Sequence, residues 1–467
     1  MMSDSARQSA LAAVVAALPS LDWIKEAPKV KRLSRDFHWF SPILKQQLED
    51  KFAELAVRPR NEAELSAIVA ACAKQRLPLN IRGGGTGNYG QLIPLHGGVI
   101  VDITRLNAIV AMRDGVVKAQ AGIRLADIEA QTRPLGWELR CLPSTWRLAT
   151  LGGLFGGGFG GVGSINYGPL AAPGNVLSIR VMTMEEQPRI ITLNAPEALL
   201  LHHAYGSNGI VLEIELALAP CHQWIEHLDT FDDFAAAMAF ADAIARSPGI
   251  VKRQVAVMAA PITDYFTDLA DVLTPGQHAV ISVIGSENDA LMPGLVAEHH
   301  GRCALRFAAG EHDGHSLIEY CWNHTTLQAL KVDKTLTYLQ SAFAAEHYHQ
   351  QVLEMEQRLS GEVLSHIEFL RDLNGNLTCS GLPLVRYSDE TRLNAIMQTF
   401  RDNGVKINNP HVCQIEAGKQ GRVSAEVVAV KRAFDPHNLL NPGKLRGWDI
   451  RDTLPEVNIP GITTITT

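Results

Sequence analysis

Apolar residues recur with a helical period near residue 65, and a short strand-like run of residues follows at positions 79–81. Apolar positions from Leu65 to Cys72 recur on one face, which predicts a helix over residues 61–76. Asn61 stands where its N-cap would lie, Glu64 where a capping-box partner would lie, and Pro78 predicts its end. A short strand is predicted at residues 79–81.

The same periodicities predict further short elements along the chain. Strands are predicted at residues 99–103, 116–121, 176–184 and 211–218, and helices at residues 9–19, 124–135, 196–203 and 231–245. We interpret the chain as leader helices over residues 1–47, a first domain over 48–220, a second over 221–425, and a C-terminal segment over 426–467 that returns to the first domain.

Composition supports a multidomain globular protein. A chain of 467 residues exceeds one ordinary core, and 46% hydrophobic with 19% charged residues is typical of soluble proteins. The net charge of -7 argues against nucleic acid as a partner, although a local basic pocket for a small anion stays open. No apolar run approaches the ~20 residues that span a bilayer.

Cysteine usage indicates a reducing compartment. There are seven cysteines, an odd number, and no C-x-x-C pair, so neither a disulfide framework nor a structural zinc site is expected. We therefore predict a cytoplasmic protein without a membrane span.

Two glycine-rich blocks carry the candidate chemistry. Residues 85–90 and 156–161 both match the G-x-G-x-x-G spacing, but neither is followed by the helix that a Rossmann site requires. Both blocks are predicted to be irregular loops. Successive backbone N–H groups in such loops can hold a pyrophosphate, and Arg82 beside the first loop could balance its charge. The alternative is that the glycines merely form turns.

Four motifs in order resemble the FAD-linked oxidases and dehydrogenases typified by p-cresol methylhydroxylase and vanillyl-alcohol oxidase. Residues 82–90 with 101–107 look like the family's pyrophosphate loop and following strand, and residues 143–168 look like its second flavin-binding stretch. Residues 206–211 look like its next element, and residues 435–444 resemble the C-terminal motif of the glycolate-oxidase-subunit and D-lactate-dehydrogenase branch. The likeness covers roughly residues 48–220 and 426–445.

The resemblance implies an α+β fold, with a two-subdomain FAD-binding domain of the p-cresol methylhydroxylase type and an α+β cap that carries substrate contacts. The first loop would bind the pyrophosphate of FAD, and the second would lie along the isoalloxazine and ribityl chain. The implied cofactor-binding residues are Arg82, Gly83, Gly84, Gly85, Thr86, Gly87, Asn88, Tyr89, Pro143, Ser144, Thr145, Thr150, Gly152, Gly153, Gly156, Gly157, Gly158, Gly161, Gly163, Ser164, Tyr167, Gly209, Ile210, Asn441 and Lys444.

FAD is predicted to be bound non-covalently. Some relatives tether it to a histidine of the first loop or a cysteine of the second stretch. The first loop here has no histidine, and Cys141 lies too far ahead of Thr150 to match the cysteine position. A tether from the cap or from His38 stays open.

No metal is predicted from the resemblance. The 2-hydroxy-acid branch carries H-x-x-D-G-N-x-H and later E-H-G. Here His366 begins the first stretch, but its spacing is lengthened and Thr378 ends it, while Ala417 replaces the later histidine. Two ligand positions are thus lost, which weakens the case for a 2-hydroxy-acid substrate without removing it.

The catalytic candidates are histidine, glutamate and lysine residues of the second domain. A histidine or glutamate could take a hydroxyl proton, and a lysine could hold a carboxylate. The candidates are His324, Lys334 with Lys331, His366, His411 and Glu416. A hydrogen-bonded structural role, or a solvated helix face for the lysines, is the alternative for each.

These patterns favour an FAD-dependent dehydrogenase or oxidase that moves hydride from a hydroxyl-bearing carbon of a small 2-hydroxy acid or alcohol to flavin N5. Alternatives are an aryl-alcohol or phenol oxidase of the vanillyl type, a flavin subunit that passes electrons to an iron–sulfur partner, and a non-catalytic flavin-binding protein. The sequence does not determine the substrate, its stereochemistry, the electron acceptor or the oligomeric state, a homodimer included.

Overall fold

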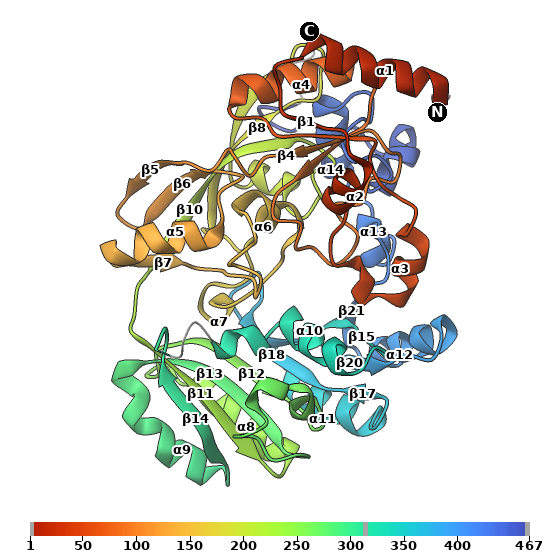
Figure 1. The fold of residues 1–467 in the computed structure, drawn as a ribbon. Coiled ribbons are helices and arrows are strands. Elements are labelled where there is room, and N and C mark those ends of the chain that lie inside the picture. Colours follow the sequence, from red (N-terminus) through yellow and green to blue (C-terminus); the bar gives the residue numbers. More distant parts are fainter. Residues whose placement is uncertain (1–3, 312–315, 463–467) are drawn as a thin grey trace.

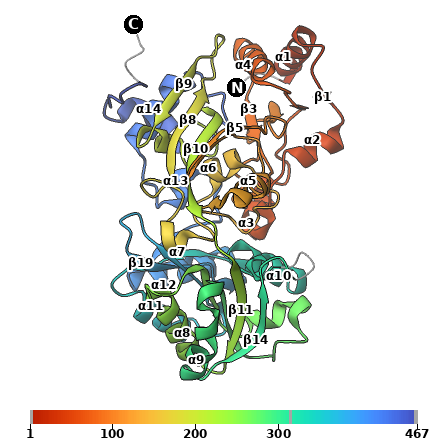
Figure 2. The ribbon, with the colours of Figure 1, turned by 90° about the vertical axis from the view of Figure 1, so that its left-hand side faces the viewer.

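The computed structural model describes residues 4–311 and 316–462. Two lobes are stacked on each other (Figure 1), and the chain begins in the upper lobe, passes through the lower one and returns to the upper one near its end. Figure 2 shows the same stacking from the side, with α7 at the junction of the lobes.

Two sheets build the upper lobe. The first has the order β1-β2-β4-β3, in which β2, β4 and β3 are parallel: β1 Trp23–Ile24, β2 Leu55–Val57, β3 Leu79–Arg82 and β4 Val99–Asp102. The second is antiparallel with the order β5-β6-β10-β8-β9, and β7 pairs with the end of β10: β5 Ile109–Arg113, β6 Val116–Gln120, β7 Trp137–Leu139, β8 Val176–Met182, β9 Ile190–Asn194 and β10 Ile210–Pro220.

The lower lobe contains an eight-stranded antiparallel sheet and a small three-stranded one. The large sheet has the order β14-β11-β13-β12-β18-β19-β16-β21: β11 Trp224–Phe231, β12 Lys252–Met258, β13 His278–Gly285, β14 Arg302–Ala308, β16 Gln340–Ala342, β18 His366–Arg371, β19 Leu377–Gly381 and β21 Lys406–Asn408. The small sheet joins β15 Leu336–Tyr338, β20 Leu384–Arg386 and β17 Val363–Leu364.

Helices cover both lobes. Those of the upper lobe are α1 Asp4–Ala17, α2 Ala27–Leu33, α3 Pro42–Leu48, α4 Glu62–Lys74, α5 Leu125–Thr132, α6 Leu151–Gly157, α7 Ser164–Tyr167, α13 Ile415–Gly418 and α14 Ala425–Phe434. Those of the lower lobe are α8 Phe234–Arg246, α9 Met292–Glu298, α10 Asn323–Val332, α11 Tyr348–Arg358 and α12 Glu390–Asp402. Short 3-10 helices occur at His38–Phe40, Arg133–Leu135, Glu197–Leu201, Ile262–Tyr265, Thr267–Leu269, Ser286–Leu291, Leu317–Tyr320 and Arg446–Thr453.

Most of the predicted elements are present with small shifts of their ends. The Asn61 side chain accepts a hydrogen bond from the Glu64 backbone at the start of α4, as predicted, whereas Glu64 returns its bond to the Arg60 backbone, one residue earlier than a capping box requires. The helix predicted at residues 231–245 begins three residues late, because Phe231 still belongs to β11 and the Asp233 side chain caps α8.

The prediction that both glycine blocks are irregular is wrong for the second one. Residues Leu151–Gly157 form α6, whose N-terminus is capped by the Thr150 hydroxyl, which accepts from the Gly153 backbone. Glycine is a poor helix former, so packing decides here: Leu151, Leu154 and Phe155 are buried in the upper-lobe core. The first block contains no helix.

The N-terminal apolar run forms a packed amphipathic helix. Ala10, Leu11 and Val14 of α1 are buried in one core with apolar residues of α4 and β4. Among residues 4–311 and 316–462, no helix has both the length and the apolar character to cross a membrane.

Candidate functional site

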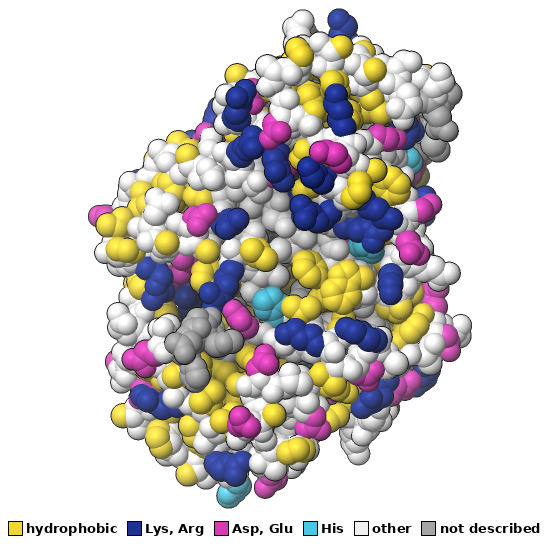
Figure 3. Space-filling view, in the orientation of Figure 1, with side chains coloured by type: hydrophobic (Ala, Val, Ile, Leu, Met, Phe, Trp, Pro, Cys, Tyr) yellow, Lys and Arg dark blue, Asp and Glu magenta, His cyan; other side chains and the backbone are white. Residues whose placement is uncertain are grey.

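A cavity of about 500 Å³ lies where the two lobes meet, a size typical of ligand sites. The first glycine loop and α6 line it from the upper lobe, and the start of α10 with strands β16 and β21 lines it from the lower lobe. Seen from outside, lysine and arginine side chains gather beside the hollow between the lobes (Figure 3).

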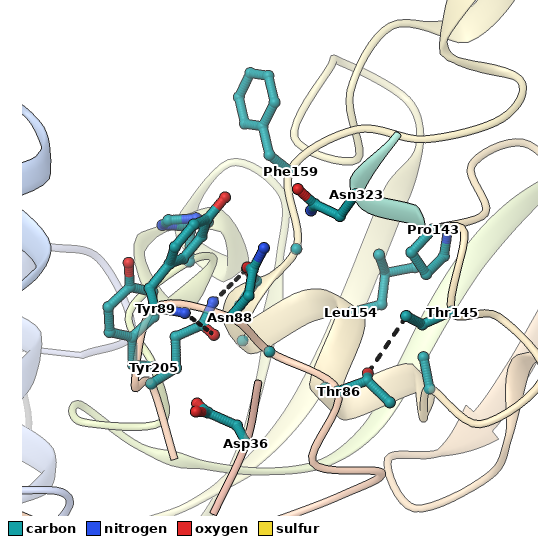
Figure 4. Close-up of a pocket in the computed structure, with 18 of the residues that line it drawn as sticks. Asp36, Thr86, Asn88, Tyr89, Pro143, Thr145, Leu154, Phe159, Tyr205 and Asn323 are labelled. Carbon is teal, nitrogen blue, oxygen red and sulfur yellow. Dashed lines mark hydrogen bonds between the residues drawn. The ribbon is translucent and has the colours of Figure 1, made fainter. Parts of the chain in front are cut away.

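Hydrogen bonds join the first glycine loop to the second block. The Gln91 side chain donates to the Gly157 carbonyl at 2.9 Å, and Thr145 and Thr86 hydroxyls lie 3.4 Å apart (Figure 4). A Cβ atom at Gly83 would lie 2.0 Å from Thr150 Oγ1. The two segments therefore approach so closely that glycine is required where they touch.

Arg82 supports the first loop from behind rather than facing the cavity. Its guanidinium donates to the backbone carbonyls of Leu33 at 2.7 Å and Arg35 at 2.9 Å. Burial lowers the pKa of Arg82, opposed by the nearby Asp102 and Asp36 carboxylates. The side chain thus fixes the loop and adds positive charge beneath it.

The C-terminal motif holds the loop from another direction. The Asn441 amide donates to the carbonyls of Gln91 at 2.8 Å and Tyr205 at 2.7 Å, and the buried Lys444 ammonium donates to the Gly90 carbonyl at 2.6 Å. Neither side chain lines the cavity, so both position the residues that do.

Most of the predicted cofactor residues surround the cavity. Those that line it are Gly83, Gly84, Gly85, Thr86, Gly87, Asn88, Tyr89, Pro143, Ser144, Thr145, Thr150, Gly152, Gly153, Gly156, Gly157, Gly158 and Gly209. Outside the lining lie Arg82, Gly161, Gly163, Ser164, Tyr167, Ile210, Asn441 and Lys444. Residues 161–167 instead join the lobes: the Gly163 backbone donates to the Arg253 carbonyl at 2.8 Å.

Buried polar atoms without partners point to a polar ligand. Asn88 Nδ2, His203 Nδ1 and Asn323 Oδ1 belong to cavity-lining residues, are shielded from solvent and form no hydrogen bond within the described residues. Asn88 and Asn323 face the same space from opposite lobes in Figure 4. Because buried polar groups are normally paired, these atoms fit a ligand with several donors and acceptors, as FAD has.

Three basic side chains on the cavity lining were not predicted from the sequence. Lys406 of β21, Lys419 and Arg422 all line the cavity. Burial lowers the pKa of Lys419, and the Glu416 carboxylate opposes that shift. Lys419 directly follows the Glu416-Ala417-Gly418 stretch and Arg422 lies three residues further on, so their closeness to that motif was the signal that could have identified them.

Only one predicted catalytic residue reaches the cavity. His324, at the start of α10, lines it, and burial lowers the pKa of His324 to about 4. The imidazole is therefore neutral at physiological pH, which is the form that can accept a proton.

The other candidates make structural contacts. His411 bridges the Ser41 hydroxyl at 2.8 Å and the Tyr338 carbonyl at 2.9 Å, and Glu416 accepts from two backbone N–H groups, those of Arg446 and Gly447. Lys334 donates to the Leu330 carbonyl and Lys331 to the Gln328 side chain.

The stretch around His366 is a β-hairpin. His366 begins β18, residues 372–376 form the turn, and β19 returns, so Asp372 lies at the far end of a six-residue strand from His366. His366 contacts Glu368 at 2.9 Å. Glu368 in turn accepts from the Trp322 backbone at 2.5 Å, which places this buried pair beneath the cavity-lining Trp322.

Neither His38 nor Cys141, the two residues considered for a covalent tether, lines the cavity. His38 is buried against Asp36, 3.1 Å from its carboxylate, and Cys141 is buried beside Ser164. The histidines of the described lining are His203 and His324.

Comparison with known proteins agrees with this geometry. Residues 53–191 match the family model of an FAD binding domain. The chain is 23% identical over 436 residues to the glycolate oxidase subunit GlcD of Bacillus subtilis, which covers 85% of this chain and 90% of that protein.

Other relatives match over shorter stretches. The D-lactate dehydrogenase of Archaeoglobus fulgidus is 27% identical over 42% of this chain and 46% of its own length. The D-2-hydroxyglutarate dehydrogenase of Escherichia coli is 33% identical over 28% of this chain and 13% of its own length. The solved structure of an alkyldihydroxyacetonephosphate synthase shares the fold, with a TM-score of 0.67 at 14% identity over 94% of this chain and 85% of that chain.

Proposed function

We propose, from the premise that this chain belongs to the FAD-linked oxidases and dehydrogenases, that it oxidises the hydroxyl-bearing carbon of a small 2-hydroxy acid. FAD is its cofactor and, when bound, supplies the hydride acceptor at N5. One observation carries the substrate class: a neutral histidine and three basic side chains line the same cavity as the glycine-rich loops. A 2-hydroxy acid presents a hydroxyl and a carboxylate, the two groups that these side chains recognise.

The upper lobe builds the side of the cavity that would face FAD. Backbone N–H groups of the glycine loops would hold the pyrophosphate, and the unpaired Asn88 amide would satisfy a polar group of the cofactor. We expect non-covalent attachment, because neither His38 nor Cys141 lines the cavity. Acid precipitation of the protein tests this: free flavin in the supernatant agrees with it, and flavin retained in the pellet contradicts it.

The substrate-facing side of the cavity is built by the lower lobe and by residues 419–422. His324 would accept the hydroxyl proton of the substrate, since its buried imidazole is neutral. Lys406, Lys419 and Arg422 would hold the carboxylate by charge-assisted hydrogen bonds and so orient the carbon that loses hydride.

The test is the visible spectrum of the purified protein without oxygen while D- and L-2-hydroxy acids, and then aryl alcohols, are added. Bleaching of the flavin band by one enantiomer of a 2-hydroxy acid supports the proposal. Bleaching by aryl alcohols alone favours the vanillyl-type alternative. That alternative has less support, because no tyrosine from residues 221–425 lines the cavity in the described structure.

A second candidate role is that of a flavin subunit in a larger complex. The relative that aligns over most of its own length is itself named a subunit. In that role the chain would pass electrons to a partner that holds an iron–sulfur cluster. Co-purification of such a partner, together with slow reoxidation of the isolated chain by oxygen, would support it, and fast reoxidation by oxygen would argue for a self-sufficient oxidase.

A further inference from the structure

A second polar cluster lies in the lower sheet, away from the cavity. His227 and Asp229 belong to β11 and Cys303 to the neighbouring β14 (Figure 1). Their potential ligand atoms all lie within 4.8 Å of one another, and none of the three residues lines the cavity. The cluster is thus independent of the proposed FAD site.

A β-bulge brings the three side chains to one face of the sheet. His227 pairs with Arg306 and Leu228 with Leu305, but Asp229 pairs with Cys303, which leaves Ala304 as the extra residue. Side chains alternate between the faces of a strand, so without the bulge Cys303 would point to the opposite face from Asp229. Bulges that redirect a side chain in this way occur often beside functional sites.

The Asp229 carboxylate lacks a partner although it is fully buried. Neither of its oxygens accepts a hydrogen bond from the described residues, and its exposure is 0%. Ser282, which pairs with His227 from β13, also has a buried hydroxyl without a partner. Buried carboxylates are ordinarily paired or bound to a metal.

The surroundings of the cluster suit a cation. His227 Nε2 lies 3.0 Å from Asp289 Oδ1, and a carboxylate bonded to one ring nitrogen is the usual partner of an imidazole that binds a metal through the other. Asp289 also accepts from Arg306 at 2.8 Å, which neutralises the nearby positive charge. Cys303 is exposed, so an ion at this place would be reached from solvent.

We propose that His227, Asp229 and Cys303 bind a single zinc ion. Imidazole, carboxylate and thiolate together favour Zn²⁺ over the harder divalent cations. Zinc bonds of about 2.0–2.3 Å place tetrahedral ligands roughly 3.5 Å apart. The three side chains must therefore draw together by about an ångström, which rotation of the exposed Cys303 can provide, and water fills the fourth position. This site would tie β14, at the sheet edge, to β11.

Cobalt titration tests the site in the full-length, flavin-loaded protein after treatment with a chelator. We expect one equivalent of Co²⁺ to bind, with the visible absorption of tetrahedral cobalt at wavelengths beyond the flavin band, and Zn²⁺ to displace it. Cys303→Ala and Asp229→Asn should abolish this absorption. Asp289→Asn should weaken Zn²⁺ binding by about 10–100-fold, because it removes the carboxylate that holds the His227 imidazole in place.

Cys221→Ala is the matched control, because Cys221 is half-buried and lies outside the cluster. Zn²⁺ should raise the thermal midpoint of the wild type and of Cys221→Ala, and leave that of Cys303→Ala unchanged. If Asp229→Asn fails to fold, the exposed Cys303→Ala variant decides. The proposal is overturned if wild-type protein binds no Co²⁺, or if the cobalt absorption survives in Cys303→Ala.

Discussion

His324 shows how burial can prepare one residue for chemistry. It lines the cavity, and the same desolvation that lowers its pKa to about 4 keeps it neutral at the pH of the cell. Two of the other predicted catalytic groups make structural contacts: His411 and Glu416 bond to hydroxyl and backbone groups and do not line the cavity. Sequence position near a motif did not separate these two roles.

His324→Gln should leave FAD bound and slow flavin reduction by a 2-hydroxy acid by about 100-fold or more, because it removes the proposed base. In the wild type, the rate should be flat through the ordinary histidine range and fall only as pH drops towards about 4, where the imidazole becomes charged. Stopped-flow reduction without oxygen measures both. The surface variant His222→Gln serves as the control, and an unchanged rate in His324→Gln would refute the assignment.

Lys419→Gln should raise KM for a 2-hydroxy acid and lower kcat/KM by roughly 10–100-fold, the range expected for loss of a charged hydrogen bond. Because burial lowers the pKa of Lys419, KM should also rise with increasing pH below the range in which an ordinary lysine titrates. Lys331→Gln is the matched control, since Lys331 lies outside the cavity lining. Equal effects of both substitutions would contradict a carboxylate contact at Lys419.

Among the elements, α6 depends most on its surroundings. Four of its seven residues are glycine, and its Thr150 cap touches the first glycine loop at Gly83. A Cβ at Gly152 would lie 2.8 Å from the Ala121 side chain, whereas a Cβ at Gly156 would have no chain atom nearer than 3.9 Å. Glycine is thus needed for packing at one position of the helix and not at the other.

This difference predicts opposite effects of two alanine substitutions in one helix. Gly152→Ala should lower the free energy of unfolding of the apoprotein by about 1–3 kcal/mol through overpacking. Gly156→Ala should leave it unchanged or raise it by up to about 1 kcal/mol through helix propensity, and weaken FAD binding because Gly156 faces the cavity. Urea unfolding and FAD titration separate the two, and equal destabilisation by both would show the packing argument to be wrong.

At the scale of the molecule, buried polar contacts hold the lobes together beside the cavity. His411 links Ser41, the N-cap residue of α3, to Tyr338 of the small lower sheet, and Thr337 donates to the Phe40 carbonyl at 2.8 Å. Burial lowers the pKa of His411 to about 4, so the bridging imidazole is neutral near pH 7.

Acid should therefore destabilise the folded protein through this contact between the lobes. His411 has a folded-state pKa below its unfolded value near 6.5, so the unfolded chain takes up the proton first and stability falls as pH drops from about 6.5 to 4, by at most about 1.4 kcal/mol per pH unit from this residue. His411→Gln should be less stable at pH 7.5 but lose less stability between pH 7 and 5. Urea midpoints across that range measure this, and identical slopes in both proteins would exclude a role for His411.

The sequence by itself indicated an FAD-binding domain, with FAD as the cofactor, and most of the local elements, because these depend on short-range patterns. Neighbouring residues encode the helix cap at Asn61, the strands around the first glycine loop and the glycine-rich loops. What only the tertiary structure decided depends on residues far apart in the chain. The folded chain placed His324, but not His366 or His411, on the cavity lining together with Lys406, Lys419 and Arg422, and core packing made α6 a helix. Strand register placed Cys303 beside His227 and Asp229, and no local pattern encodes the desolvation or pairing that results.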